Sequence, residues 1–132
     1  MARLSRGETV ALSHGEQIRD FTDVDCAAQA FLDALAAPAE ACGGVYHIGS
    51  GRGTSVRALA LTVAGMVGSP DLIQFGASES EDGDVPVLVA EPSRATSVLG
   101  WRPDRNLEAR VRDAVEWWLA RLGARNGSES IA

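Results

Sequence analysis

The sequence contains no lysine, and all 12 of its basic residues are arginine. A reaction that needs a catalytic lysine is therefore closed to this chain acting alone. The same absence excludes the P-loop, in which a lysine reaches the outer phosphates of a nucleotide. Tyrosine is also scarce, because Tyr46 is the single example, and aromatic residues make up only 5% of the chain. The core must consequently be built mainly from Ala, Val, Leu and Ile.

Cysteine, histidine and long apolar runs are scarce as well. Cys26 and Cys42 do not make a disulfide framework and are typical of thiols in a cytosolic protein. His14 and His47 lack further clustered ligands, which predicts no metal site. No apolar run approaches the roughly 20 residues of a membrane span, and the N-terminus has no apolar signal-peptide core. We therefore expect a cytoplasmic protein without a membrane partner.

Basic charge is in deficit, because the net charge is −6 and the isoelectric point is about 4.8. A nucleic-acid surface needs a basic stripe that displaces counterions from the phosphates. The charge balance therefore argues against nucleic acid as a partner, and also against anionic lipid.

Strand-like and helix-like segments alternate along the 132 residues, which is the size of one domain. Alternating apolar residues predict strands, and 3.6-residue spacing predicts helices. The pattern indicates an α/β or α+β-like fragment with a few-stranded sheet and about four helices. Two or three strands are few for so many helices, so the chain resembles part of something larger. We expect strands over 8–13, 43–49 and 71–76, an extended piece within 14–21, helices over 23–37, 54–68 and 106–123, and a short helix that ends at Gly100.

Two of the predicted helices carry an apolar stripe. In the helix over 23–37, Asp23 or Asp25 is expected to cap the first turn, and Pro38 to end the helix. Its stripe comprises Ala27, Ala30, Phe31, Ala34 and Leu35. The stripe of the last helix comprises Leu107, Val111, Ala114, Trp118 and Leu122. Residues 124–132 are expected to form a flexible tail, beyond a single portion over 1–123.

The stretch VYHIGSGRGTSVRAL, residues 45–59, has the outline of a strand, a glycine-rich turn and a helix start. Backbone amides at such turns often hold a phosphate. A dinucleotide fingerprint would need a third glycine where Thr54 stands. Asp71 precedes the next strand, whereas the fingerprint's acidic residue ends it. The prediction is a tight turn in which Thr54 or Ser55 caps the following helix; the alternative is a helix N-terminus that contributes to a neighbouring ligand.

Three stretches together resemble one family. GEQIRDFTDVDCAAQAFLDAL (15–35) is similar to the G-x-Q-x-R-D-F segment of the extended short-chain dehydrogenase/reductases, which include the NAD(P)-dependent nucleotide-sugar epimerases and dehydratases. VYHIGSGRGTSVRALA (45–60) resembles their V-Y-N-I-G-S-G segment. GDVPVLVAEPSRATSVLGWRP (83–103), followed by NLEARVRDAVEWW (106–118), resembles their ending. Order and spacing agree over nearly the whole chain.

The resemblance implies the C-terminal, substrate-binding portion of such an enzyme, without the Rossmann N-terminal half. In the family the coenzyme fingerprint and a Tyr-x-x-x-Lys acid/base pair lie in the N-terminal part, and nothing here matches either. Ser50 stands four residues after Tyr46. The resemblance therefore implies a nucleotide-diphosphate sugar as ligand, with no catalytic residue, no coenzyme site and no bound NAD(P) in this chain alone.

The resemblance also implies site residues. Arg19 stands where the family places an arginine on the diphosphate, and a guanidinium fork can bind two phosphate oxygens. The alternative for Arg19 is a surface ion pair with Asp20 or Asp23. Gln17 and Phe21 fit the same segment and are expected to position it.

One departure from the family concerns a second arginine that usually precedes G-D-x-P. Glu81 and Asp82 occupy that region here, and Arg52 is the candidate substitute. The alternative for Arg52 is a solvated turn residue without a ligand.

Three functions stay open at this point. The chain could be a nucleotide-sugar-binding portion that is inactive alone, or a half-enzyme completed by a separate N-terminal chain. It could also be a non-catalytic module that senses nucleotides or associates with itself as a homo-oligomer.

Overall fold

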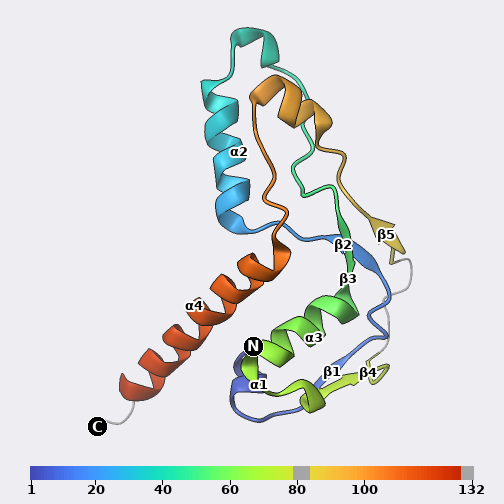
Figure 1. The fold of residues 1–132 in the computed structure, drawn as a ribbon, viewed down its shortest axis with the longest axis vertical. Coiled ribbons are helices and arrows are strands. Elements are labelled where there is room, and N and C mark those ends of the chain that lie inside the picture. Colours follow the sequence, from blue (N-terminus) through green and yellow to red (C-terminus); the bar gives the residue numbers. More distant parts are fainter. Residues whose placement is uncertain (79–83, 129–132) are drawn as a thin grey trace. The chain divides into compact units, whose positions relative to one another are not determined.

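The computed structural model describes residues 1–78 and 84–128, with the side chains described as far as Gly123. The chain divides into two compact units. The first takes its residues from 1–16, 55–84 and 108–132, and the second comprises 17–54 and 85–107. Each unit is described by itself, and Figure 1 shows the elements of both. No helix in the described part of the chain is long and apolar enough to cross a membrane.

The first unit is built on a parallel pair of short strands. β1 (Val10–Leu12) pairs with β4 (Ile73–Phe75), with Val10 opposite Ile73 and Leu12 opposite Phe75. The helix α3 (Val56–Val67) lies between them in the chain and packs with β4, with α1 (Ala2–Ser5) and with the 3₁₀ turn η2 (Pro70–Leu72). The predicted strands over 8–13 and 71–76 are therefore confirmed in shortened form.

The ends of α3 follow the rules that its sequence suggested. Ser55 precedes the helix in an extended conformation, and its hydroxyl accepts a hydrogen bond from the backbone N–H of Ala58 at 3.1 Å. Gly68 ends the helix in the left-handed region, at a φ of 77°, where a Cβ atom would be strained. Of the two predicted caps, Ser55 therefore holds the position and Thr54 does not.

The helix α4 (Leu107–Ser128) continues past Gly123, where the sequence pattern had placed its end. Its predicted stripe is partly wrong. Val115 is the buried residue, whereas Trp118 is 44% exposed. Val115 follows Val111 by one helical step of four residues, so the buried row continues through it and leaves Trp118 to the side.

The second unit contains a three-stranded sheet with β2 (Ile18–Asp20) at its centre. β5 (Val87–Leu88) runs parallel to β2, with Ile18 opposite Val87, and β3 (Gly53–Ser55) forms the other edge. The helix α2 (Val24–Ala36) and the helical turn η3 (Ala95–Leu99) pack together. Beneath them Trp101 is fully buried with Ala30 and Ala95, and its indole N–H donates to the Cys26 carbonyl at 3.0 Å.

The predicted strand over 43–49 is not a strand in the structure. Its side chains still alternate, because Tyr46 and Ile48 pack on the core while Val45 and His47 are exposed. In the sheet of this unit, β2 pairs with β3 on one side and with β5 on the other. The segment therefore has the alternating burial of a strand without its hydrogen bonding, and the prediction of a strand over 43–49 is wrong.

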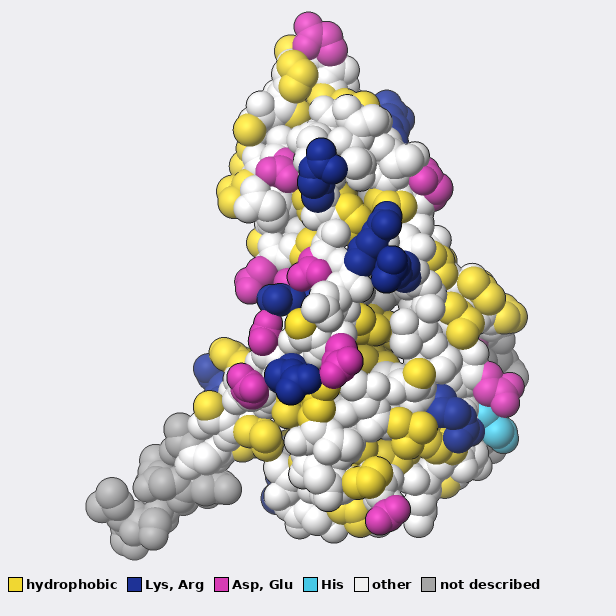
Figure 2. All heavy atoms as spheres, in the orientation of Figure 1, with side chains coloured by type: hydrophobic (Ala, Val, Ile, Leu, Met, Phe, Trp, Pro, Cys, Tyr) yellow, Lys and Arg dark blue, Asp and Glu magenta, His cyan; other side chains and the backbone are white. Residues whose placement is uncertain are grey.

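The predicted apolar face of α2 is also corrected. Asp23 caps the helix, as expected, by accepting from the backbone N–H of Cys26, and the helix ends at Ala36 before Pro38. However, Phe31 and Leu35 are 74% and 84% exposed. The row that meets the core consists of the smaller residues Cys26 and Ala30, because the bulk of Trp101 leaves room only for short side chains. Apolar side chains are visible over the edge where α2 lies (Figure 2).

Candidate functional site

The glycine-rich turn is organised around one carboxylate, that of Asp20 at the end of β2. Its oxygens accept hydrogen bonds from the backbone N–H of Ser50 at 2.9 Å, of Gly51 at 2.9 Å and of Ala90 at 3.2 Å. The Ser50 hydroxyl donates a fourth, at 2.5 Å, and in turn accepts from the N–H of Arg52 at 3.1 Å. The carboxylate therefore ties the turn to β2 and to the segment that follows β5.

The glycines are required here by space and by backbone conformation. A Cβ at Gly49 would come within 2.4 Å of the Ala90 side chain and 2.6 Å of the Asp20 carboxylate. A Cβ at Gly53 would come within 2.4 Å of the Ile18 side chain. Gly51 has a φ of +71°, which other residues rarely adopt. The predicted tight turn is therefore confirmed, and its glycines allow close packing around β2.

Consecutive amides at a turn often hold a bound anion. In this turn the amides of Ser50 and Gly51 already donate to Asp20, and that of Arg52 donates to Ser50. A phosphate could reach them only by displacing the carboxylate. The backbone amides of the turn are thus already hydrogen-bonded within the chain. A ligand would therefore be recognised by the side chains that surround the turn.

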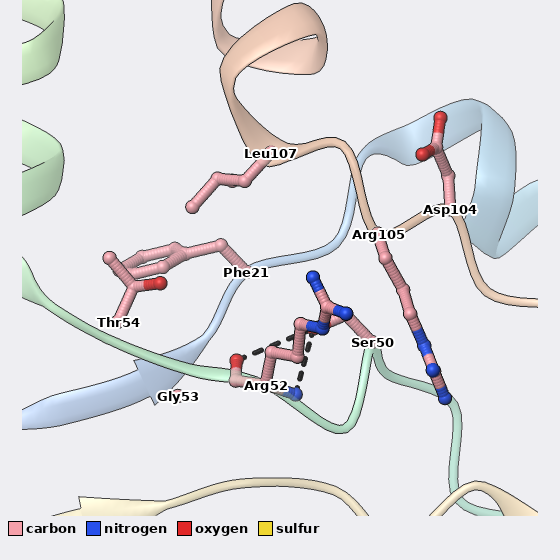
Figure 3. A pocket seen from close by; sticks show the side chains of 8 residues that line it. All are labelled: Phe21, Ser50, Arg52, Gly53, Thr54, Asp104, Arg105 and Leu107. Carbon is pink, nitrogen blue, oxygen red and sulfur yellow. Dashed lines mark hydrogen bonds between the residues drawn. The ribbon is translucent and has the colours of Figure 1, made fainter.

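Such side chains line a hollow of about 220 Å³ beside the turn. Phe21, Thr54 and Leu107 lie at one end of it, and Arg52 and Arg105 at the other (Figure 3). The rest of the lining comes from Ser50, Gly53 and Asp104. The hollow therefore combines an apolar wall with two guanidinium groups.

A second, more open hollow of about 500 Å³ shares Arg105 and includes Gly51. Polar groups of η3 and of the segment before it line this hollow, among them Glu91, Ser93 and Ser97. The Glu91 carboxylate accepts from the Ser93 hydroxyl at 2.7 Å and from its backbone N–H at 3.1 Å. These two hydrogen bonds, with a smaller effect of His47, lower the pKa of Glu91 below its ordinary value near 4.5.

The structure brings only two of the four predicted site residues, Phe21 and Arg52, into the same hollow. Gln17 directly precedes β2 and is half-buried. Arg19 lies in β2, and its Nη1 donates to the carbonyls of Ile18 and Val85, each at 2.8 Å. Neither Gln17 nor Arg19 is among the residues that line the hollow.

Two residues of this site were missed in the sequence. Asp20 was considered only as an ion-pair partner of Arg19, and Arg105 was not singled out. The spacing between Asp20 and Ser50 is 30 residues, so no local pattern joins them. Asp23, the other suggested partner of Arg19, uses its carboxylate to cap α2. In the described residues, no group of three or more His, Cys, Asp or Glu side chains could hold a metal ion.

Comparisons with known proteins agree with the sequence motifs. The chain is 32% identical over 127 residues to the dTDP-L-rhamnose 4-epimerase of Burkholderia thailandensis, which covers 95% of the chain and 34% of that enzyme. A solved structure of UDP-glucose 4-epimerase with UDP-glucose from Thermotoga maritima is 30% identical, with a TM-score of 0.81 over 91% of the chain and 38% of that protein. A structure of MoeE5 with UDP-glucuronic acid and NAD is 28% identical, with a TM-score of 0.77 over 91% and 41%. No family model matches the chain.

The fold and the matched sequence therefore place the chain among the extended short-chain dehydrogenase/reductases, as its three motifs indicated. More particularly, it corresponds to a C-terminal portion of such a protein, and the relatives that it matches include dTDP-L-rhamnose and UDP-glucose 4-epimerases. The chain spans about a third of the length of the curated relatives that it matches.

Proposed function

We propose that this chain is the nucleotide-sugar-binding portion of an NAD(P)-dependent sugar epimerase or dehydratase and that it does not catalyse the reaction alone. One observation carries the proposal: nearly the whole chain matches, in sequence and in fold, part of an epimerase that was solved with UDP-glucose. The coenzyme fingerprint and the Tyr-x-x-x-Lys pair are absent from the 132 residues. The hydride chemistry therefore needs sequence that this chain does not contain.

Arg19 is the residue that we assign to the diphosphate of the nucleotide. Its Nη1 is anchored by the carbonyls of Ile18 and Val85, which join β2 to the segment before β5. An anchored guanidinium loses less conformational freedom when it binds, so its hydrogen bonds to phosphate oxygens contribute more to affinity.

The test is binding of UDP-, dTDP- and GDP-sugars to the chain, followed through its amide NMR spectrum. One nucleotide series should shift a defined set of peaks, and Arg19→Ala should weaken this binding by about tenfold or more, as expected for a charged hydrogen-bonding group. Arg19→Gln keeps a donor for the carbonyls but loses the charge, so it separates folding from binding. Arg112→Ala is the control, because Arg112 lies on α4 in an exposed pair with Glu108.

The outcome that contradicts the proposal is a dispersed spectrum that no nucleotide sugar changes. Catalysis is tested separately, with NAD and the same sugars. Formation of NADH or of a new sugar by this chain alone would show that the non-catalytic part of the proposal is wrong.

A second candidate is a self-associating interaction module. It is favoured by the exposed apolar side chains of α2, where Val24, Phe31, Leu32 and Leu35 are each more than half exposed. Large contiguous apolar surfaces of this kind mark interaction sites in many proteins. Sedimentation over a range of concentrations distinguishes a homo-oligomer from a monomer, and co-expression with an N-terminal epimerase half tests for a completing chain.

A further inference from the structure

Two arginines, Arg52 and Arg105, line the hollows beside the glycine turn. Arg52 and Arg105 line the first hollow, and Arg105 also lines the second. Both side chains are exposed. Within the described residues neither guanidinium has an ion-pair or hydrogen-bond partner. Their cationic groups are therefore available to a ligand, unlike those of Arg6 or Arg110, which form ion pairs with Glu8 and Asp113.

The charge of the first hollow selects an anion. Asp104 is the one carboxylate among its lining residues, and its Oδ1 already accepts from the backbone N–H of Asn106 at 2.8 Å. Two guanidinium groups against one carboxylate leave a positive balance. Guanidinium forks match phosphate oxygens in pairs, so a dianionic phosphate can engage both arginines, whereas a single carboxylate matches one.

Size limits what the first hollow can hold by itself. The hollow of about 220 Å³ is smaller than the roughly 300–1,000 Å³ of sites for larger small molecules. It suits a phosphate group. The adjoining hollow is larger and is lined by the hydroxyl-bearing residues Ser93, Thr96 and Ser97, together with the Glu91 carboxylate. Hydroxyls and carboxylates are the partners that sugar hydroxyl groups require.

We infer that the two hollows form one site for a sugar monophosphate, distinct from Arg19. The phosphate lies between Arg52 and Arg105, and the sugar extends past Gly51 toward the segment 91–97. Gly51 lines the second hollow and carries no side chain that would occupy it. The inference does not depend on nucleotide-sugar binding, since none of its contacts involves Gln17 or Arg19.

The experiment uses the whole chain and three probes, which are inorganic phosphate, glucose and glucose 1-phosphate. Amide NMR peaks of Arg52 and Thr54 report on the first hollow, and those of Ser93 and Ser97 on the second. Glucose 1-phosphate should shift both groups, and phosphate only the first. Glucose should shift neither at the same concentration, because it lacks the charged anchor.

Arg52→Met and Arg105→Met keep most of the side-chain length and remove the charge, and each should weaken glucose 1-phosphate binding at least tenfold. Arg102→Met is the matched control, because Arg102 is exposed in the same unit but lines neither hollow. Because neither tested arginine holds the fold by a described hydrogen bond, the variants should keep a dispersed spectrum. The inference is overturned if about 10 mM glucose 1-phosphate shifts the amide peaks of neither hollow. It is also overturned if a variant with both Arg52→Met and Arg105→Met binds glucose 1-phosphate as tightly as the original chain.

Discussion

At the scale of single residues, Asp20 has the most contacts to lose. Its carboxylate accepts four hydrogen bonds from three residues, Ser50, Gly51 and Ala90, which are separated from it by 30 to 70 positions along the chain. Hydrogen bonds to a charged group contribute about 1.5–3 kcal/mol each at most, and buried donors left without a partner add a further cost. One side chain thus holds three segments of the second unit together.

Replacing Asp20 tests this role. We expect Asp20→Ala to lower the free energy of unfolding by about 3 kcal/mol, since the amides of the turn would lose their acceptor. Asp20→Asn keeps one acceptor oxygen and should lose less. Urea denaturation gives both values. A loss below about 1 kcal/mol in Asp20→Ala would show that water replaces the carboxylate without difficulty.

Two glycines provide a matched pair for the close approach of the turn to β2. Gly53→Ala puts a Cβ within 2.4 Å of the Ile18 side chain, whereas Gly65→Ala, in the middle of α3, meets nothing within 4 Å. The first change should destabilise the protein by about 1–3 kcal/mol through overpacking. The second should stabilise it by about 0.5–1 kcal/mol, because alanine favours helix. Thermal melts of the two variants should therefore move in opposite directions.

At the scale of elements, Glu91 begins the segment that leads into η3. Its pKa is lowered by hydrogen bonds from Ser93, so its contribution to stability is complete above the ordinary value near 4.5 and is lost as the pH falls through the folded value. We expect Glu91→Gln to reduce the loss of stability between about pH 5 and pH 3. The comparison is made by urea titration at each pH. Equal pH profiles for the two proteins would contradict the assignment.

The ends of α2 and α3 were predictable from sequence, whereas the buried faces of the helices and the structure of residues 43–49 were not. Capping depends on residues within one turn, so Asp23, Ser55 and Gly68 could be located from local pattern. The exposure of Phe31 and the absence of a strand over 43–49 depend on contacts with segments that are distant in sequence. The packing of Trp101 against Ala30 joins residues that are 71 positions apart, so the local sequence around α2 does not reveal it.

The candidate site shows the same division. Phe21 and Arg52 could be proposed because they belong to motifs, and the hollow contains both. The contribution of Arg105 comes from a segment more than 50 positions after Arg52, which only the fold brings near. The assignment of Arg19 and Gln17 to a ligand stays a prediction that the binding experiment tests.

At the scale of the whole molecule, the two units alternate along the chain. The chain passes between them after Glu16, Thr54, Asp84 and Leu107. The segments of each unit are therefore joined through the other unit. Unfolding one unit lengthens the loops that connect the segments of the other, which raises the entropic cost of keeping that unit folded. We expect the two units to unfold together, as one cooperative transition.

The three tryptophans can measure this. Trp101 is buried in the second unit, while Trp117 and Trp118 are 55% and 44% exposed on the part of α4 in the first. Acrylamide should quench the latter two readily and Trp101 hardly at all. The Trp101→Phe variant and the variant with Trp117→Phe and Trp118→Phe together each leave tryptophan fluorescence from one unit. Within each variant, the urea midpoint from fluorescence should coincide with the midpoint from far-UV circular dichroism. Separate midpoints would show that the units are independent.

The carboxylate inside the glycine turn also bears on how glycine-rich motifs are interpreted in genomes. A search that scores only the local density of glycine would count residues 49–53 as a candidate nucleotide loop, although Thr54 departs from the full fingerprint. The aspartate that fills this turn stands 30 residues earlier, outside the window of any such search. The glycine spacing here is explained by the close packing of one segment of the protein against another, since side chains at Gly49 and Gly53 would collide with their neighbours.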